Sequence, residues 1–142
     1  MKNFNLITCS FVLLLLFACK KKTDFPSKDL ENIIGEWEWE EASGGFAGVT
    51  VTPASEGYTE SLLFQQNGEF VKYRDSLEYQ NYFFWITEGS SIFSAEPAYL
   101  LLLGSRDQAT INFTYSIDLD GDILYLNEEC NDCFRFKYRR KP

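Results

Sequence analysis

Two cysteines near the end of the chain have a spacing that can support chemistry. Cys130 and Cys133 form the Cys-x-x-Cys of CNDC. A thiol redox site would place this pair at the start of a helix in a βαβ unit, whereas a strand-like segment follows here. A zinc site would need two further ligands, which the sequence does not supply nearby. We therefore expect a structural disulfide between Cys130 and Cys133, worth roughly 2 kcal/mol in the chain-entropy model.

The chain contains no histidine. This absence removes Ser-His-Asp and Cys-His nucleophilic sites together with the commonest zinc and iron ligand. Carboxylates, lysines and tyrosines could still act in catalysis, but no pair of them is singled out by its spacing. We accordingly expect no enzyme activity, no catalytic residue, no cofactor and no bound metal.

A group of acidic residues has the spacing of positions 1, 3, 5 and 12 of a calcium-binding loop: Asp118, Asp120, Asp122 and Glu129. That loop requires glycine at position 6, where Ile123 stands, and a helix on each side. The flanking segments instead alternate like strands. A hairpin turn at Asp120-Gly121 is the favoured interpretation.

The first residues of the chain have the pattern of a secretory leader. Lys2 precedes a mostly apolar stretch from Phe4 to Ala18, which is shorter than the roughly 20 residues that span a bilayer. The end of this stretch and the residues after it read LLLLFACKKK, so Cys19 directly follows the apolar residues. This arrangement resembles a bacterial lipoprotein signal. The resemblance implies a signal peptide over residues 1–18, which is removed, and acyl chains such as palmitate on Cys19. An ordinary cysteine after a plain secretory leader is the alternative.

A lipidated cysteine would anchor the protein to a membrane after secretion. Each buried methylene contributes about 0.8 kcal/mol, so two or three acyl chains suffice. Residues 19–28 would form the anchor and a flexible tether, and residues 29–142 one domain. We expect a cell-envelope location, with the outer membrane favoured. The 21 acidic and 13 basic residues give a net charge of −8, which argues against a nucleic-acid partner.

Almost every segment after Gly35 alternates apolar and polar residues with the two-residue period of a strand. This alternation predicts eight to ten antiparallel strands that pair mainly with their sequence neighbours. Asn67-Gly68 and Asp120-Gly121 are typical of tight hairpin turns. The one helix we predict is short, at about Lys28 to Ile33, and is capped by Ser27.

Charges on the first and last strands indicate that the sheet closes on itself. The outward glutamates of GEWEWEEA would lie across from the outward cations of CFRFKYRR, in this order: Glu36 to Arg139, Glu38 to Lys137 and Glu40 to Arg135. Closure would also remove two exposed sheet edges. The alternative is that both charged stripes are only solvated faces. We predict an all-β fold, an antiparallel meander β-barrel.

Gly35-Glu36-Trp37, a G-x-W that enters the first strand after a short helical turn, looks like the opening of lipocalin and lipocalin-like barrels. Residues 44–75 and 123–141 are similar to small lipocalin-like lipoproteins of Bacteroidetes-type bacteria. The likeness covers about residues 33–141. It implies a meander barrel with a mouth at one end and, more loosely, ligand binding.

Two functions remain open at this point. In the first, the barrel binds a small apolar or amphipathic ligand, with these residues as its wall: Trp37, Trp39, Phe64, Phe70, Phe113 and Tyr115. The same residues could instead be plain core, since side chains alone can fill an eight-stranded barrel. In the second, the barrel is filled and the protein is an accessory or structural envelope lipoprotein that binds a protein partner. LEYQNYFFWITEG is apolar on both faces, so its second face is either covered, for example by EPAYLLLLG, or exposed to a partner.

Overall fold

The structure is a computed structural model that describes residues 23–142. The predicted signal peptide and Cys19 lie outside the described residues. In chain order the elements are η1 (Lys28–Ile33), β1 (Gly35–Gly44), β2 (Val49–Val51), α1 (Pro53–Glu56), β3 (Glu60–Phe64), β4 (Glu69–Arg74), β5 (Leu77–Gly89), β6 (Ala98–Gly104), β7 (Ile111–Asp120), β8 (Ile123–Glu128) and β9 (Phe134–Arg140).

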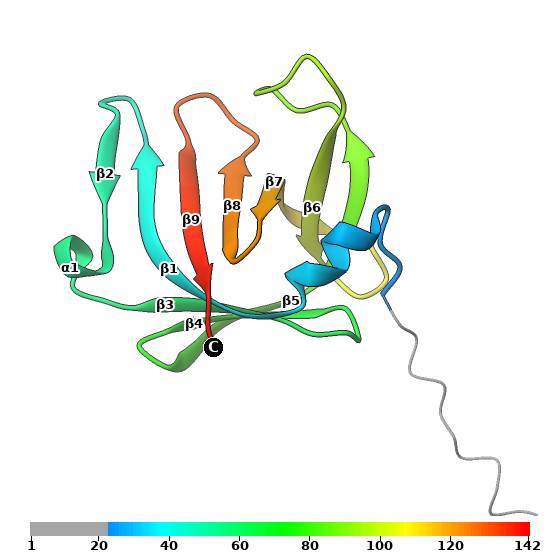
Figure 1. The fold of residues 1–142 in the computed structure, drawn as a ribbon, viewed down its shortest axis with the longest axis horizontal. Helices are drawn as coiled ribbons and strands as arrows, with labels where there is room; N and C mark the ends of the chain where they lie inside the picture. The colour runs from blue at the N-terminus through cyan, green and yellow to red at the C-terminus, as the bar shows by residue number, and fades with distance from the viewer. Residues whose placement is uncertain (1–22) are drawn as a thin grey trace, which may run out of the picture.

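The strands form a single antiparallel sheet that closes into a barrel (Figure 1). Strands β3 to β8 each pair with the next strand in sequence, and β1 pairs with both β3 and β9. The result is a closed eight-stranded barrel with β2 added beside the end of β1. This confirms the predicted all-β meander barrel, and it is consistent with a lipocalin-like architecture.

The β1–β9 pairing closes the barrel with the expected strands but in a different register. Glu38 lies opposite Arg139, two residues away from the predicted pairing, and an irregularity in β1 between Trp39 and Glu41 shifts the register by one further residue beyond that point. Glu40 binds both Lys137, at 2.9 Å, and Arg139. The predicted pairings of Glu36 with Arg139, Glu38 with Lys137 and Glu40 with Arg135 are therefore wrong in register.

The displaced partners make other contacts. Lys141 Nζ lies 2.8 Å from Glu36 Oε1, one pair further along the strands than we predicted. The Arg135 guanidinium lies 4.0 Å from the centre of the Tyr125 ring instead of meeting Glu40. Charge complementarity thus follows the β1–β9 seam from Glu36 to Glu40.

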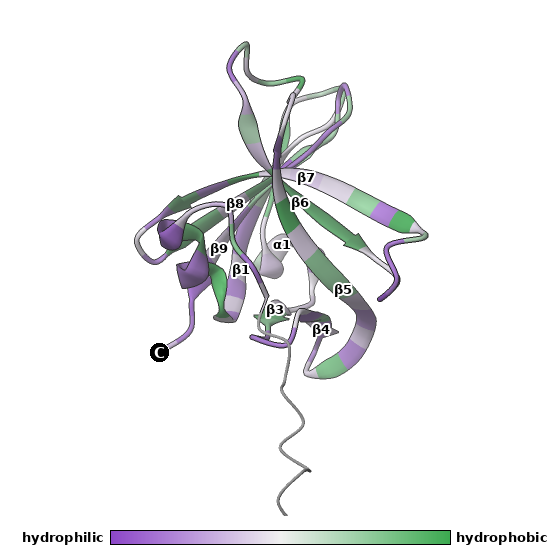
Figure 2. Cartoon of the chain, turned by 90° about the vertical axis from the view of Figure 1, so that its right-hand side faces the viewer, coloured by the Kyte–Doolittle hydropathy of each residue, from purple (hydrophilic) through white to green (hydrophobic). Residues whose placement is uncertain are grey.

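Burial alternates along the middle of β5 and separates an inner from an outer face. Figure 2 shows that hydrophobic and hydrophilic residues are both present along this strand. Phe84 and Ile86 are buried, whereas Phe83 and Trp85 are only partly covered on the outside. The Arg106 guanidinium lies 4.6 Å from the centre of the Phe83 ring. The segment EPAYLLLLG does not cover this face, because most of it forms β6 beside β5.

The helix η1 lies across one end of the barrel. It has the predicted bounds, and Ser27 caps it by accepting a hydrogen bond from Asp29 N. Leu30 and Ile33 of η1 are buried in the core, and Trp37 Nε1 donates to Ile33 O at 2.8 Å. These contacts make η1 a plug for this end, which we call the closed end.

Arg140 at the end of β9 fixes η1 to the barrel. Its Nη1 donates to Ile34 O at 3.1 Å, and its Nη2 donates to Asn32 O. Its guanidinium lies 4.3 Å from the Trp37 ring centre, and its Nε lies 3.3 Å from Asp122 Oδ1. One side chain thereby joins the start of the barrel to its last strand.

Part of the predicted tether packs on the barrel. Thr23 N donates to Gln66 O at 3.1 Å, and the Phe25 ring lies 6.4 Å from the Phe84 ring. The chain therefore enters the described structure at the closed end. No helix among residues 23–142 is long and apolar enough to cross a membrane.

The sequence did not predict α1. Thr52 and Ser55 form a capping box, and Pro53 occupies the first turn. This combination favours a single helical turn within the connection between β2 and β3. We missed it because four residues are too few to show a helical period.

Replacing Glu40 with Gln should lower the free energy of unfolding by about 0.5–1 kcal/mol near neutral pH. Arg139 and Lys137 lower the pKa of Glu40, so its stabilisation is present above the unfolded pKa and is lost as the pH falls through the folded value. In urea titrations, the difference between wild type and variant should shrink from about pH 7 to about pH 3. Glu88→Gln, on the exposed end of β5, is the control. A difference that grows on acidification would contradict the prediction.

Arg140→Met should destabilise the barrel by about 2–3 kcal/mol, because it leaves two carbonyl groups without their donor and removes the cation from the Trp37 ring. Urea unfolding followed by tryptophan fluorescence measures this loss. Arg135→Met is the matched control, since Arg135 lies on the same strand but stacks on the exposed face. Equal losses for the two variants would show that Arg140 has no special role.

Candidate functional site

The barrel interior contains most of the residues that we predicted as a ligand wall. Trp37, Trp39, Phe64 and Phe70 are all at least 96 % buried. They pack with other large buried side chains: Phe84, Leu62, Leu101, Leu124 and Tyr138. The barrel interior around these four residues is therefore filled by the protein itself, which is the plain-core alternative for them.

The opposite end of the barrel is lined differently. There the connections after β1, before β3 and before β9 come together, with Gly45 N donating to Cys133 O and Asp75 N donating to Thr59 O. We call this end the mouth. Phe113 is 37 % exposed and Tyr115 is half-buried, so these two predicted wall residues belong to the mouth and not to the deep core.

Aromatic rings line the mouth from two sides. Phe113 and Tyr115 face inward because they lie directly opposite the buried Leu103 and Leu101 of β6. The ring of Phe113 lies 5.6 Å from that of Tyr82 and 6.4 Å from that of Tyr115. A second row on β9 contains Phe134, Phe136 and Tyr138, with ring distances of 6.2 and 6.4 Å.

A charged cluster includes Tyr138, the last residue of the β9 row. We call it the Glu60 cluster, and it consists of Glu60, Lys72, Arg74 and Tyr138. Glu60 Oε1 accepts a hydrogen bond from Tyr138 Oη at 2.8 Å and lies 3.0 Å from Lys72 Nζ. Glu60 Oε2 lies 3.7 Å from Arg74 Nη2. Two cations therefore surround a single carboxylate that is only 5 % exposed.

Sequence reasoning missed the Glu60 cluster, although a signal was present. Glu60 alternates with Leu62 and Phe64, so it shares their inward face. The register places Arg74 opposite Glu60 and Lys72 opposite Leu62, which brings both cations to the same side. If the two-residue period had been applied to the charged residues as well as to the apolar ones, it would have placed the charged members of this cluster on the inward face.

Next to the cluster, aromatic and cationic groups alternate in a stack. The Tyr58 ring lies 5.5 Å from that of Trp39, and the Arg74 guanidinium lies 4.1 Å from the Tyr58 ring centre and 4.5 Å from that of Tyr79. Two buried nitrogens here, Trp39 Nε1 and Arg74 Nε, have no hydrogen-bond partner in the structure. A buried donor left unsatisfied costs about 1–3 kcal/mol.

The two inward phenols of this region stay protonated at neutral pH. Burial raises the pKa of Tyr138 well above its usual value, and the Glu60 carboxylate adds to the effect. Burial also raises the pKa of Tyr115, followed by the charges of Glu128 and Glu60. Both phenols are therefore neutral donors, suited to hydrogen bonding.

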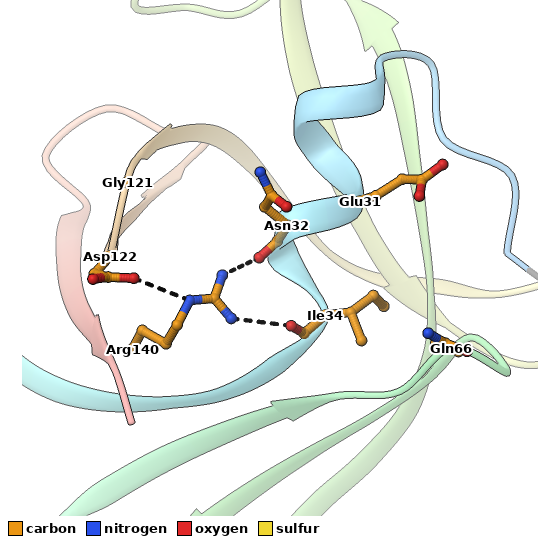
Figure 3. A pocket seen from close by; sticks show the side chains of 7 residues that line it. All are labelled: Glu31, Asn32, Ile34, Gln66, Gly121, Asp122 and Arg140. Carbon is orange, nitrogen blue, oxygen red and sulfur yellow. Dashed lines mark hydrogen bonds and ion pairs between the residues drawn. The ribbon is translucent and has the colours of Figure 1, made fainter. Parts of the chain in front are cut away.

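The closed end carries a separate polar pocket of about 520 Å³ (Figure 3). Its lining comes from η1, the two neighbouring hairpins and β9: Glu31, Asn32, Ile34, Gln66, Gly121, Asp122 and Arg140. The Arg140 guanidinium already binds acceptors of the chain itself, as the dashed lines in Figure 3 mark. A ligand would have to displace these contacts.

The remaining sequence candidates have structural partners. Cys130 and Cys133 lie at disulfide distance, with their Cα atoms 5.6 Å apart. Glu128 lies beside them, but disulfide sulfurs lack the thiolate that binds metals. Asp120 and Ile123 flank a hairpin turn, as we expected, and Glu129 accepts from Ser91 Oγ and Ile92 N.

Comparison with known proteins gives no match. No family model, no curated protein and no solved structure matches this chain.

Proposed function

We propose that this protein is a lipid-anchored, lipocalin-like lipoprotein whose barrel mouth binds a small amphipathic molecule. The closed eight-stranded meander, the short helix across one end and the opening Gly35-Glu36-Trp37 support the lipocalin-like assignment. The observation that carries the binding function is the lining of the mouth, where half-buried aromatic rings lie beside charged side chains. Ligand sites typically combine mostly apolar walls with a few polar groups that fix orientation.

The filled deep core limits where such a molecule can bind. Trp37 and Leu101 have no exposed surface, and Phe64 and Phe84 have only 1 %. The ligand therefore binds near the mouth, against Phe113, where inward side chains still reach solvent. Because this position is shallow, the bound molecule must be small.

A membrane anchor on Cys19 completes the proposal. Thr23 is bound to Gln66 at the closed end, and residues 20–22 separate it from Cys19. A chain spans at most about 3.3–3.6 Å per residue, so the lipid would hold the closed end near the membrane. The mouth would then open away from the lipid surface.

A protein partner is the second candidate function. Three apolar side chains on loops are unusually exposed: Phe46 at 97 %, Ile92 at 55 % and Phe93 at 58 %. Glu129 holds the loop that presents Ile92 and Phe93 by accepting hydrogen bonds from Ser91 and Ile92. A fixed apolar loop of this kind suits contact with another protein.

The Cys19→Ser variant should leave the membrane fraction when the full chain is produced in a diderm bacterium, because it lacks the acceptor for the acyl chains. Fractionation and the mass of the amino-terminal peptide measure this outcome. Cys9→Ser is the control and should stay membrane-bound. A wild-type protein without an acyl mass on Cys19 would refute the anchor.

Native mass spectrometry of the protein extracted from its own membrane should show a co-purifying small molecule. Phe113→Asp should lose it, because a carboxylate replaces part of the apolar mouth. Phe93→Asp is the matched control and should keep it. A protein that co-purifies and is lost only in Phe93→Asp would favour the second function, and the absence of any small molecule would contradict the first.

A further inference from the structure

We propose that the molecule bound in the mouth carries an anionic head group, of the carboxylate or sulfonate class, which binds at Lys72 and Arg74. This inference rests on the proposed ligand-binding function and names the chemistry of the ligand. The starting observation is the imbalance of the Glu60 cluster, in which Lys72 and Arg74 share one carboxylate.

The carboxylate of Glu60 is already occupied. It accepts from Tyr138 and contacts both cations, and it is the most deeply buried charged group of the cluster. Glu128 on β8 accepts a hydrogen bond from Phe134 N at 3.0 Å. Glu60 therefore offers one negative charge to two cations.

The cations are more accessible than the carboxylate that they share. The Lys72 side chain is 18 % exposed and that of Arg74 is 36 % exposed, against 5 % for Glu60. A molecule that enters from the mouth thus meets positive charge first. An anion gains from both cations, whereas a cation would be repelled before it reached Glu60.

The guanidinium of Arg74 suits the same chemistry. Its side chain is 36 % exposed, so part of it can contact a molecule in the mouth. An anionic head group supplies several acceptor atoms at once, and guanidinium groups bind such planar acceptors in pairs.

The apolar part of the molecule has a matching surface. Lys72 Nζ lies 5.8 Å from the centre of the Phe136 ring, which continues the aromatic row of β9. Tyr115 and Phe113 face the interior from β7. A head group at Lys72 and Arg74 therefore leaves its tail among these rings.

The test uses the full lipoprotein in lipid nanodiscs, titrated calorimetrically with decanoate and with the neutral decanol, with empty nanodiscs as the reference. The wild type should bind decanoate at least about tenfold more tightly than decanol. Arg74→Met and Lys72→Met should each abolish this preference. Arg106→Met, which removes an exposed arginine outside the cluster, should leave both affinities unchanged.

A further variant keeps the proposal falsifiable if the cation variants fail to fold. Glu60→Gln keeps the shape of the side chain and removes the competing charge, so decanoate affinity should rise several-fold. An unchanged or weaker affinity would overturn the anionic head group. Equal binding of decanoate and decanol would overturn it as well but leave the ligand-binding function standing, whereas binding of neither probe would refute both.

Discussion

The pairing of β1 with β9 is the interaction on which the rest of this structure depends. Without this pairing, the sheet would keep two open edges and would not enclose a barrel interior. Each opposite-charge pair along the seam contributes only about 0.2–1 kcal/mol, so these pairs select which strands meet more than they hold them together. Backbone hydrogen bonds and the burial of Trp37, Trp39 and Tyr138 behind the seam supply the larger share.

Closure also decides what happens at the two ends of the barrel. Because the last strand lies beside the first, Arg140 reaches the carbonyl groups of η1 and the face of Trp37. The helix is thereby fixed as a plug, and the core beneath it is filled with large side chains. The other end has no such plug among the described residues, so aromatic and charged side chains that face inward remain partly in contact with solvent.

The interior polar groups follow from the same constraint. A residue that faces into a closed barrel cannot be solvated on its own, so Glu60 requires Tyr138, Lys72 and Arg74 around it. The arrangement is not fully satisfied, since Trp39 Nε1 and Arg74 Nε lack acceptors. A protein under selection for stability alone would more simply place apolar residues here, and the proposed anionic head group would account for the second cation beside Glu60.

The sequence by itself determined the fold class, because a period of two residues can be read locally wherever one face of a strand is buried. It also determined the short helix with its Ser27 cap and the turn at Asp120-Gly121, because their signals lie within a few residues. Only the tertiary structure decided the register of β1 on β9, the clamp of Arg140 on η1 and the grouping of Glu60 with Tyr138. These contacts join residues far apart in the chain, and the register of the seam differs by two residues from the one that the charge pattern predicted. Local patterns carry no information about such a shift.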